Sequence, residues 1–334
     1  MARKIALTGI QPSGTPHLGN YLGMYRPALE LAADYDAYYF IADYHALTTV
    51  RDGESLTRNT YEVAAIWLAL GLDPHKATLY RQSDVPEVFE LAWALGCVTP
   101  KGLLNRAHAY KAALDANAAA GRSPDDGVSM GLYNYPLLMA ADILICGAHV
   151  VPVGSDQRQH VEMTDDIASW FNNAYGPILT PPEAIVRDEV ALIPGLDGRK
   201  MSKSYGNVIP IFAPPKEQRK LVMRIVTDSR PPEEPKDPAQ DNLFNIFKHF
   251  AAPGEVAEVR ARYESGGIGY GEVKSRLAEL LEESFGPARE RYDALLSNTP
   301  HLDEALAGGA DRVRAVARPL LQRVRDAVGT GARL

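Results

Sequence analysis

The sequence has few cysteines, no long apolar run and no excess of positive charge, and each absence excludes a class of protein. Cys97 and Cys146 are the only two cysteines among 334 residues, too few for a disulfide framework or an iron–sulfur site. The sequence contains no run of about 18 apolar residues, so no transmembrane helix is predicted. The amino-terminal segment lacks a signal-peptide pattern. The net charge of −7 argues against a general polyanion-binding protein. We therefore expect a cytoplasmic protein.

In the first 205 residues, short apolar segments alternate with amphipathic ones. Strands are predicted within KIALTGIQPSG, DAYYFIADYHALT and ATLYRQSDVP, and helices within NYLGMYRPALELAADY and LTRNTYEVAAIWLALGLDP. This alternation is typical of βαβ units around a parallel sheet, which makes the fold class α/β. Residues 95–130 are polar and helical in pattern, so we interpret them as an insertion between two halves of the sheet.

The remainder of the chain, residues 206–334, has a different character. It carries equal numbers of acidic and basic residues, so the acidic excess lies in the first 205. Its pattern is helical, interrupted by glycines, and no strand signal returns. We expect two domains: residues 1–205 form the α/β domain, and residues 206–334 form an all-helical one.

Two glycine-bounded loops have the composition of phosphate-binding sites. GIQPSGTPHLGN follows the first predicted strand and leads into a helix, whose unpaired N–H groups can bind a phosphate. It matches neither GxGxxG nor a P-loop, and a simple tight turn explains it equally well. GRKMSKSYGN, residues 198–207, places Lys200 and Lys203 between Gly198 and Gly206. Read alone, it is either a solvated basic loop or a mobile phosphate-binding loop.

Taken together, the two loops resemble a known family. PSGTPHLGNY resembles the first signature of class I aminoacyl-tRNA synthetases, and KMSKS, residues 200–204, is identical to the second, about 180 residues further on. YPLLMAADILI and VPVGSDQRQHVEMTDDIA are similar to substrate-site segments of bacterial tryptophanyl-tRNA synthetases. GIGYGEVKSRLAELL resembles the C-terminal helical domain of that family, so the resemblance extends along essentially the whole chain. It implies a Rossmann-like catalytic domain followed by a helical anticodon-binding domain.

The resemblance implies ATP as co-substrate, with Mg²⁺ bound to its phosphates rather than in a dedicated carboxylate site. It assigns catalytic roles to His17, Lys111, Lys200 and Lys203; for Lys111, a solvated lysine on a polar helix is the less favoured alternative. Residues expected to line the ATP site come from both loops and from the strand end near residue 154. Val190 is expected near the adenine. The expected residues are Gln11, Pro12, Ser13, Gly19, Asn20, Gly154, Ser155, Asp156, Val190, Lys200, Met201, Ser202, Lys203 and Ser204.

The expected amino acid is tryptophan, with tyrosine as the alternative on the same fold. An indole offers one N–H donor and a large apolar face. Asp142 supplies an acceptor within an apolar helical segment, where an unpaired charge is costly, and Met139 lies on the same helix face. The resemblance adds further residues around the amino acid, namely Tyr135, Gln157, Gly9, His45 and Val153. His45 is equally consistent with a buried structural histidine.

The remaining partners follow from the resemblance alone: tRNA(Trp) and a second copy of the chain in a homodimer. Arg314, Arg318 and Arg325 fall on one face of a predicted helix. They could contact RNA phosphates, and a solvated basic face is an equally good interpretation. Pro319 is expected to kink or end that helix.

Overall fold

The computed structural model describes residues 3–154, 157–186 and 193–331. At its centre lies a five-stranded sheet in the order β3-β2-β1-β4-β5, in which every neighbouring pair is parallel. The strands are β1 (Ile5–Ile10), β2 (Asp36–Ile41), β3 (Thr78–Arg81), β4 (Val150–Val153) and β5 (Glu183–Val186). The predicted parallel α/β architecture is therefore confirmed.

Successive side chains of β2 point to opposite faces of the sheet, and helices cover both faces. Tyr38 and Phe40 belong to an apolar cluster formed with α5 (Glu87–Val98), α8 (Met130–Ile145) and α9 (Arg158–Tyr175). Tyr39 and Ile41 point to the other face, where they pack with α4 (Gly53–Ala69). Burial on both faces explains why this strand is a continuous apolar run rather than an alternating one.

The chain leaves β1 through a short helical segment and returns to the sheet at β2. That segment comprises α1 (Leu18–Asn20), a π-helical turn η1 (Tyr21–Tyr25) and α2 (Arg26–Leu31). After β2 follows α3 (Asp43–Ala46), and after β3 a 3₁₀ turn, η2 (Gln82–Asp84). Because β1 pairs with β2 on one side and β4 on the other, the carboxyl end of β1 is the switch point where ligands bind in such sheets.

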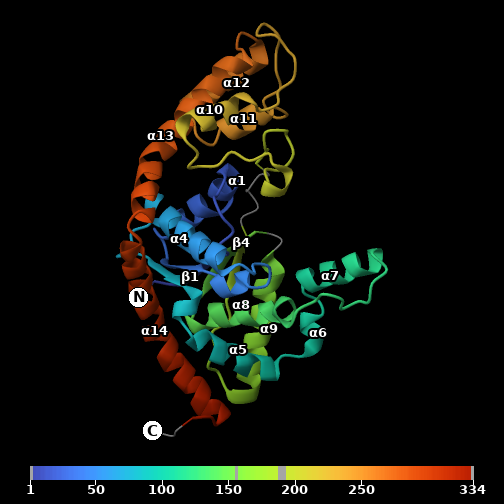
Figure 1. Ribbon diagram of the computed structural model, residues 1–334, viewed down its shortest axis with the longest axis vertical. Helices are drawn as coiled ribbons and strands as arrows, with labels where there is room; N and C mark the ends of the chain where they lie inside the picture. Colours follow the sequence, from blue (N-terminus) through green and yellow to red (C-terminus); the bar gives the residue numbers. More distant parts are fainter. Residues whose placement is uncertain (1–2, 155–156, 187–192, 332–334) are drawn as a thin grey trace.

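The helical insertion projects from the body of the protein (Figure 1). It contains α6 (Lys101–Leu104) and α7 (His108–Ala119), whereas α5 continues to Val98, inside the range predicted for the insertion. The returning loop is closed by Asn117, which is buried and donates to the carbonyls of Pro124 and Asp126.

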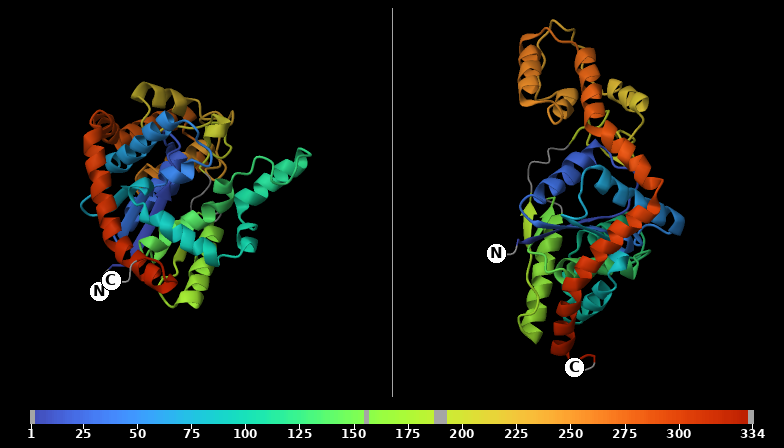
Figure 2. Two further views of the ribbon diagram at one scale, coloured as in Figure 1. Left: turned by 60° about the horizontal axis from the view of Figure 1, so that its bottom comes forward. Right: turned by 90° about the vertical axis from the view of Figure 1, so that its left-hand side faces the viewer.

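The segment after residue 205 is helical throughout its described elements. They are α10 (Pro215–Met223), α11 (Asn242–Phe247), α12 (Pro253–Ser265), α13 (Tyr270–Leu296) and α14 (Thr299–Val328). Helices α10 to α12 gather at one end of the molecule, and α13 leads back toward the sheet (Figures 1 and 2). No helix within the described ranges is long and apolar enough to cross a membrane.

Helix α14 lies along the edge strand β3 and covers it. A Cβ atom at Gly309 would lie 1.7 Å from the carbonyl oxygen of Leu79, so the helix approaches the strand backbone too closely for any side chain. Arg312 donates to the carbonyls of Pro74 and Ala77. The last helix thus protects a strand edge that would otherwise expose unpaired backbone groups.

Helix α14 continues through Pro319 to Val328, so of the kink or end expected at this proline, the end does not occur. The interpretation of the arginine stripe needs correction. Arg314 and Arg318 bind Glu87, at 2.9 and 3.1 Å. Arg325 forms a bidentate pair with Glu90 of the same helix α5. The arginine stripe is therefore engaged within the chain, because its carboxylate partners lie far away in the sequence but adjacent in the fold.

Candidate active site

The two glycine-bounded loops meet at the carboxyl end of β1. Leu18 N donates to the carbonyl of Ile209 at 3.0 Å, and Ile211 N donates to the carbonyl of Pro16 at 3.1 Å. These bonds form a short antiparallel bridge centred on His17 and Pro210. Segments almost two hundred residues apart in the sequence are thereby held side by side by backbone bonds.

Lys203 reaches across this junction. Its Nζ donates to the carbonyl of Ser13 at 2.7 Å, and partial desolvation of the ammonium group lowers the pKa of this otherwise exposed lysine. Burial, with a smaller effect of the Lys203 charge, lowers the pKa of His17 from 6.5 to about 4. His17 is therefore neutral at physiological pH, and Lys203 is the cation of this junction.

His17 also begins helix α1. Its Nδ1 accepts from Asn20 N at 3.3 Å, and the Asn20 side chain accepts from His17 N at 3.1 Å, which completes a capping box. Because Nδ1 accepts a hydrogen bond and the ring is neutral, the proton is on Nε2. A Cβ at Gly19 would lie 3.0 Å from the imidazole, so a larger residue there would press against the His17 ring.

The lysine-containing loop is organised by Asn207, a residue that the sequence interpretation missed. Its buried side chain accepts from Ser202 N at 2.8 Å and donates to the Lys200 carbonyl and to Asp197. A Cβ at Gly195 would lie 2.3 Å from the Asn207 amide nitrogen, so the loop closes tightly around this side chain. Gly198 and Gly206 have φ values of +82° and +63°, so both occupy turns that favour glycine.

The other residues of this loop vary in exposure. Met201 is buried, whereas Lys200 is exposed. The hydroxyls of Ser202 and Ser204 lie 2.9 Å apart. The loop thus combines a buried anchor with polar side chains at the surface.

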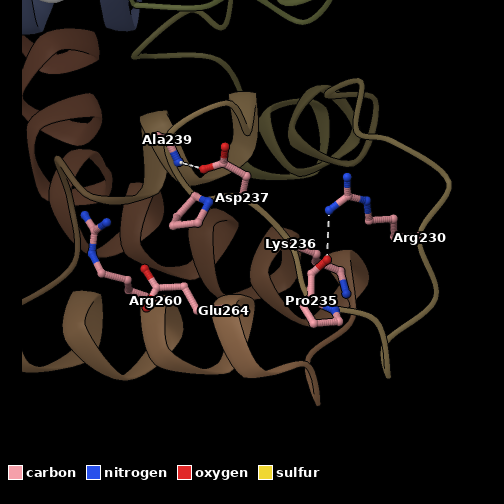
Figure 3. Close-up of a pocket in the computed structure, with 8 residues that line it drawn as sticks. Arg230, Pro235, Lys236, Asp237, Ala239, Arg260 and Glu264 are labelled. Carbon is pink, nitrogen blue, oxygen red and sulfur yellow. Dashed lines mark hydrogen bonds between the residues drawn. The ribbon is translucent and has the colours of Figure 1, made fainter.

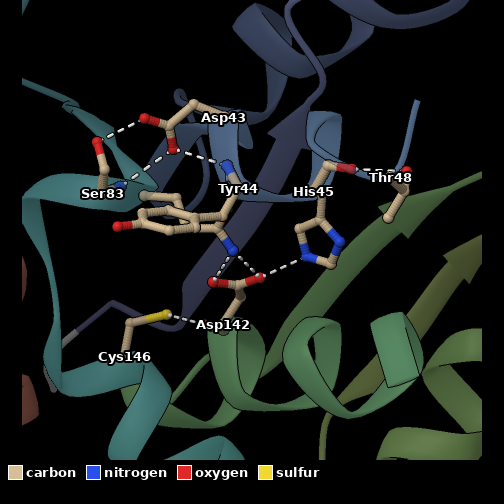
Figure 4. A network of polar contacts seen from close by, with 8 residues as sticks. Asp43, Tyr44, His45, Thr48, Ser83, Asp142 and Cys146 are labelled. Atoms are coloured by element: carbon tan, nitrogen blue, oxygen red, sulfur yellow. Dashed lines mark hydrogen bonds and ion pairs between the residues drawn. The ribbon is translucent and has the colours of Figure 1, made fainter. Parts of the chain in front are cut away.

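A second group of polar residues lies beneath the sheet end, around Asp142 of α8 (Figure 4). Asp142 is 1% exposed. His45 Nε2 lies 2.9 Å from its Oδ2, and Gln82 Nε2 lies 2.9 Å from both of its carboxylate oxygens. Burial raises the pKa of Asp142, while the hydrogen bonds from His45 and Gln82 oppose that shift.

Gln82 is a second residue of the site that the sequence interpretation did not identify. It is fully buried, and its Oε1 accepts from Tyr44 N at 3.1 Å. The only signal available was a polar residue directly after a predicted buried strand. His45, by contrast, was selected, and its contact with Asp142 brings two predicted residues together.

The remaining residues predicted around the amino acid come from α8, the end of β4 and the start of α9, with Gly9 on β1. Tyr135 and Met139 are half-buried on α8, and the Tyr135 hydroxyl is bonded to His160 Nε2 at 2.5 Å. Val153 is half-buried at the end of β4, whereas Gln157 is exposed at the start of α9.

Gly9 lies beside Phe40 in the β1–β2 register. A Cβ at Gly9 would lie 2.4 Å from the Phe40 ring, so only glycine fits between this strand end and the aromatic side chain.

Several predicted ATP-site residues have less structural context. Gln11 and Gly154 are exposed and Pro12 is buried, all at strand ends. Lys111 is exposed on α7 of the projecting insertion, away from both loops (Figure 1). Ser155, Asp156 and Val190 lie outside the described residues.

A further depression lies in the C-terminal helical region. It has a volume of about 420 Å³ and is lined by Arg230, Lys236, Asp237, Arg260 and Glu264 among others (Figure 3). Lys236 is buried and donates to three backbone carbonyls, so its charge stabilises the loop itself. Over the described ranges, no group of three or more His, Cys, Asp or Glu side chains is arranged to hold a metal ion.

Comparisons with known proteins agree with this arrangement. The sequence model of the family described as tRNA synthetases class I (W and Y) matches residues 2–286. Tryptophan–tRNA ligase of Pseudomonas aeruginosa is 52% identical over 97% of this chain and 73% of its own. That of Xanthomonas axonopodis pv. citri is 53% identical over 97% and 76%. The crystal structure of tryptophanyl-tRNA synthetase from Campylobacter jejuni complexed with ADP and tryptophan superposes with a TM-score of 0.88 at 46% identity, covering 97% of this chain and 99% of that one.

Proposed function

This chain belongs to the class I tRNA synthetases of the tryptophan and tyrosine group, and we propose that it is the ligase for tryptophan. It activates L-tryptophan with ATP to tryptophanyl-adenylate, releasing diphosphate, and transfers the tryptophanyl group to the 3′ end of tRNA(Trp). The main observation in support of the activation step is the hydrogen bond from Lys203 to the Ser13 carbonyl. This bond joins the two loops at the switch point of the sheet.

In the activation step, a carboxylate oxygen of tryptophan attacks the α-phosphorus of ATP, and the bond to the bridging oxygen of the diphosphate breaks. Negative charge grows on the leaving diphosphate, so catalysis depends on donors and cations placed around it. We assign these roles to His17, as a neutral Nε2–H donor, and to Lys203 and Lys200. Lys203 is the best placed of them, because its Nζ already lies against the loop after β1.

The loop after β1 binds ATP in this proposal, together with the end of β4. Gln11, Pro12 and Ser13 follow β1 directly, and Gly19 and Asn20 begin the adjacent helix. Mg²⁺ enters with ATP, held by the phosphates, because this ion usually binds through substrate phosphates with few protein ligands. Lys111 reaches the phosphates only if the insertion carrying α7 folds over them.

Tryptophan is recognised, in this proposal, by Asp142 accepting the indole N–H. A phenol both donates and accepts, whereas an indole N–H needs only an acceptor, and Met139 supplies a polarizable wall. The tyrosine alternative is not favoured, because relatives that are at least 50% identical along nearly the whole chain are tryptophan–tRNA ligases.

We also propose that the protein acts in the cytoplasm as a homodimer, with the helical region after residue 205 binding the tRNA anticodon. Exposed apolar side chains support self-association: Trp93 is 79% exposed, Met130 68% and Tyr44 41%. The Tyr44 ring also contacts Phe89 of α5, the helix that carries Trp93. Aromatic residues and methionine are enriched at protein interfaces.

Amino-acid-dependent ATP–diphosphate exchange tests the proposed function. We expect exchange with tryptophan and essentially none with tyrosine, followed by charging of tRNA(Trp). Replacement of Asp142 by Ala should lower kcat/KM for tryptophan by about 100-fold or more, since a site built around one buried hydrogen bond depends strongly on it. The KM for ATP should stay near the wild-type value. Efficient exchange with tyrosine, or an unchanged tryptophan KM in D142A, would overturn the assignment of Asp142.

A further inference from the structure

Gln82 makes a set of contacts that the proposed mechanism does not use. It lies in η2, directly after the carboxyl end of β3, and its side chain is fully buried. Its amide nitrogen is 2.9 Å from each oxygen of Asp142. When both polar atoms of a buried amide have specific hydrogen-bond partners, the amide can adopt only one orientation. The partners of Gln82 show which orientation this is.

The backbone of Tyr44 fixes which way the Gln82 amide faces. Tyr44 N can only donate, and it lies 3.1 Å from Gln82 Oε1. The NH₂ group must therefore face Asp142. A donor aimed at both carboxylate oxygens favours the ionised form of Asp142, which can only accept.

The hydrogen bonds to Asp142 also show how many acceptor positions of its carboxylate remain free. A carboxylate offers about four lone-pair positions. Gln82 contacts both oxygens, and His45 takes a second position on Oδ2. Contacts from the described residues thus leave Oδ1 with one fewer partner than Oδ2. One remaining position on Oδ1 suits a ligand that brings a single donor, as an indole does.

We propose that Gln82 is a positioning residue for amino-acid specificity: it orients Asp142 as an acceptor for one N–H donor. The inference rests on the proposed function, because it requires Asp142 to face the indole. Gln82 acts through Asp142 and need not touch the substrate. The contribution of a hydrogen bond to a charged group corresponds to about a 10- to 100-fold change in kcat/KM.

Gln82→Met tests this role by comparing tryptophan with an analogue whose indole N–H is replaced by sulfur, β-(3-benzothienyl)alanine. Wild-type enzyme should prefer tryptophan in ATP–diphosphate exchange. Q82M should lower kcat/KM for tryptophan by about 10- to 100-fold while changing that for the analogue little, so the preference falls. A general structural defect would lower both values equally.

Two further variants separate the outcomes. Gln82→Glu is isosteric and places a second carboxylate beside Asp142, so it should also reduce the preference for tryptophan if Q82M does not fold. Thr60→Val removes a buried hydroxyl on α4, whose partner is the Leu56 carbonyl, and serves as the control for loss of a buried polar group.

Asp142→Ala, measured with the same two substrates, distinguishes failure of the inference from failure of the proposed function. If D142A abolishes the preference and both Gln82 variants keep it, Gln82 has no positioning role and the assignment of Asp142 stands. If D142A itself keeps the wild-type preference, the Asp142 carboxylate does not recognise the indole N–H, and both proposals are overturned. Loss of the preference in D142A and in a Gln82 variant supports both.

Discussion

The two ends of the candidate site are built in different ways. At the phosphate end, backbone bonds join two loops, and Lys200 and Lys203, on either side of Met201, are exposed. At the amino-acid end, Asp142 and Gln82 are buried, and each polar atom of the pair has a protein partner. One end presents groups that can rearrange around a charged ligand, and the other presents groups already fixed in place.

This difference corresponds to the chemistry expected at each end. Charge on the diphosphate appears only as the reaction proceeds, so groups that bind it act mainly on the transition state. Recognition of an indole requires the opposite, since discrimination depends on a donor or acceptor whose position does not adapt to the wrong ligand. Mutations at the two ends should therefore separate effects on turnover from effects on amino-acid selection.

The largest expected effect at the phosphate end is that of Lys203→Ala. Removing the cation that contacts the Ser13 carbonyl should lower kcat for adenylate formation by about 100-fold, as for the loss of one preorganised transition-state donor. The KM values for ATP and tryptophan should change much less. Single-turnover kinetics measures the chemical step directly.

Lys216→Ala, at an exposed lysine of α10, is the matched control for loss of a positive charge. Its turnover should stay at the wild-type level. If K203A instead raised only the KM for ATP, Lys203 would be a docking residue, and the contrast between the two ends would disappear.

A somewhat smaller effect is expected where helix α14 supports the amino-acid end. Gly309→Ala would place a methyl group against the backbone of Leu79 in β3, the strand that leads into Gln82. Overpacking of this kind costs about 1–3 kcal/mol. We expect a lower free energy of unfolding in denaturant and a KM for tryptophan raised more than that for ATP.

Its neighbour provides the control. A Cβ at Gly308 would meet no atom within 4 Å, so Gly308→Ala should stabilise the protein by about 0.5–1 kcal/mol through helix propensity alone. Equal effects of the two substitutions would show that the close approach of α14 to β3 does not carry the stability assigned to it.

The same two ends explain which parts of the site could be predicted from the sequence. The loops were predictable because each is contiguous: glycines, lysines and a histidine stand within a few residues of one another. The parallel sheet was predictable because its strands are continuous apolar runs separated by helices. Local composition was sufficient in both cases.

Gln82 and Asn207 could not be identified because their roles depend on contacts that the sequence does not display. Gln82 contacts Asp142, which lies 60 positions further along the chain. The arginines of α14 show the same limit: their common helix face was visible, but Glu87 and Glu90 lie more than two hundred residues away. An interpretation from one helix alone could therefore offer only phosphate or solvent as partners.

The last expected effect concerns stability at the phosphate end, appears only below neutral pH and depends on His17. Its pKa is about 4 in the folded protein against 6.5 as the ordinary value. Between these values the unfolded chain binds a proton that the native protein does not, so the contribution of His17 to stability is present above pH 6.5 and is lost as the pH falls toward 4. Lowering the pH from 7 to 5 should cost the wild type about 2 kcal/mol through this group.

His17→Asn removes the titration but keeps a good N-cap residue. Urea unfolding at pH 7 and pH 5 should therefore show a smaller loss of stability for H17N than for the wild type, by about 2 kcal/mol. His75→Asn, at an exposed position, is the control for replacing a histidine. Equal losses in wild type and H17N would mean that His17 binds a proton at pH 5 as readily in the folded protein as in the unfolded chain. His17 would then be a cation beside Lys203 at that pH, where the proposal places a neutral donor.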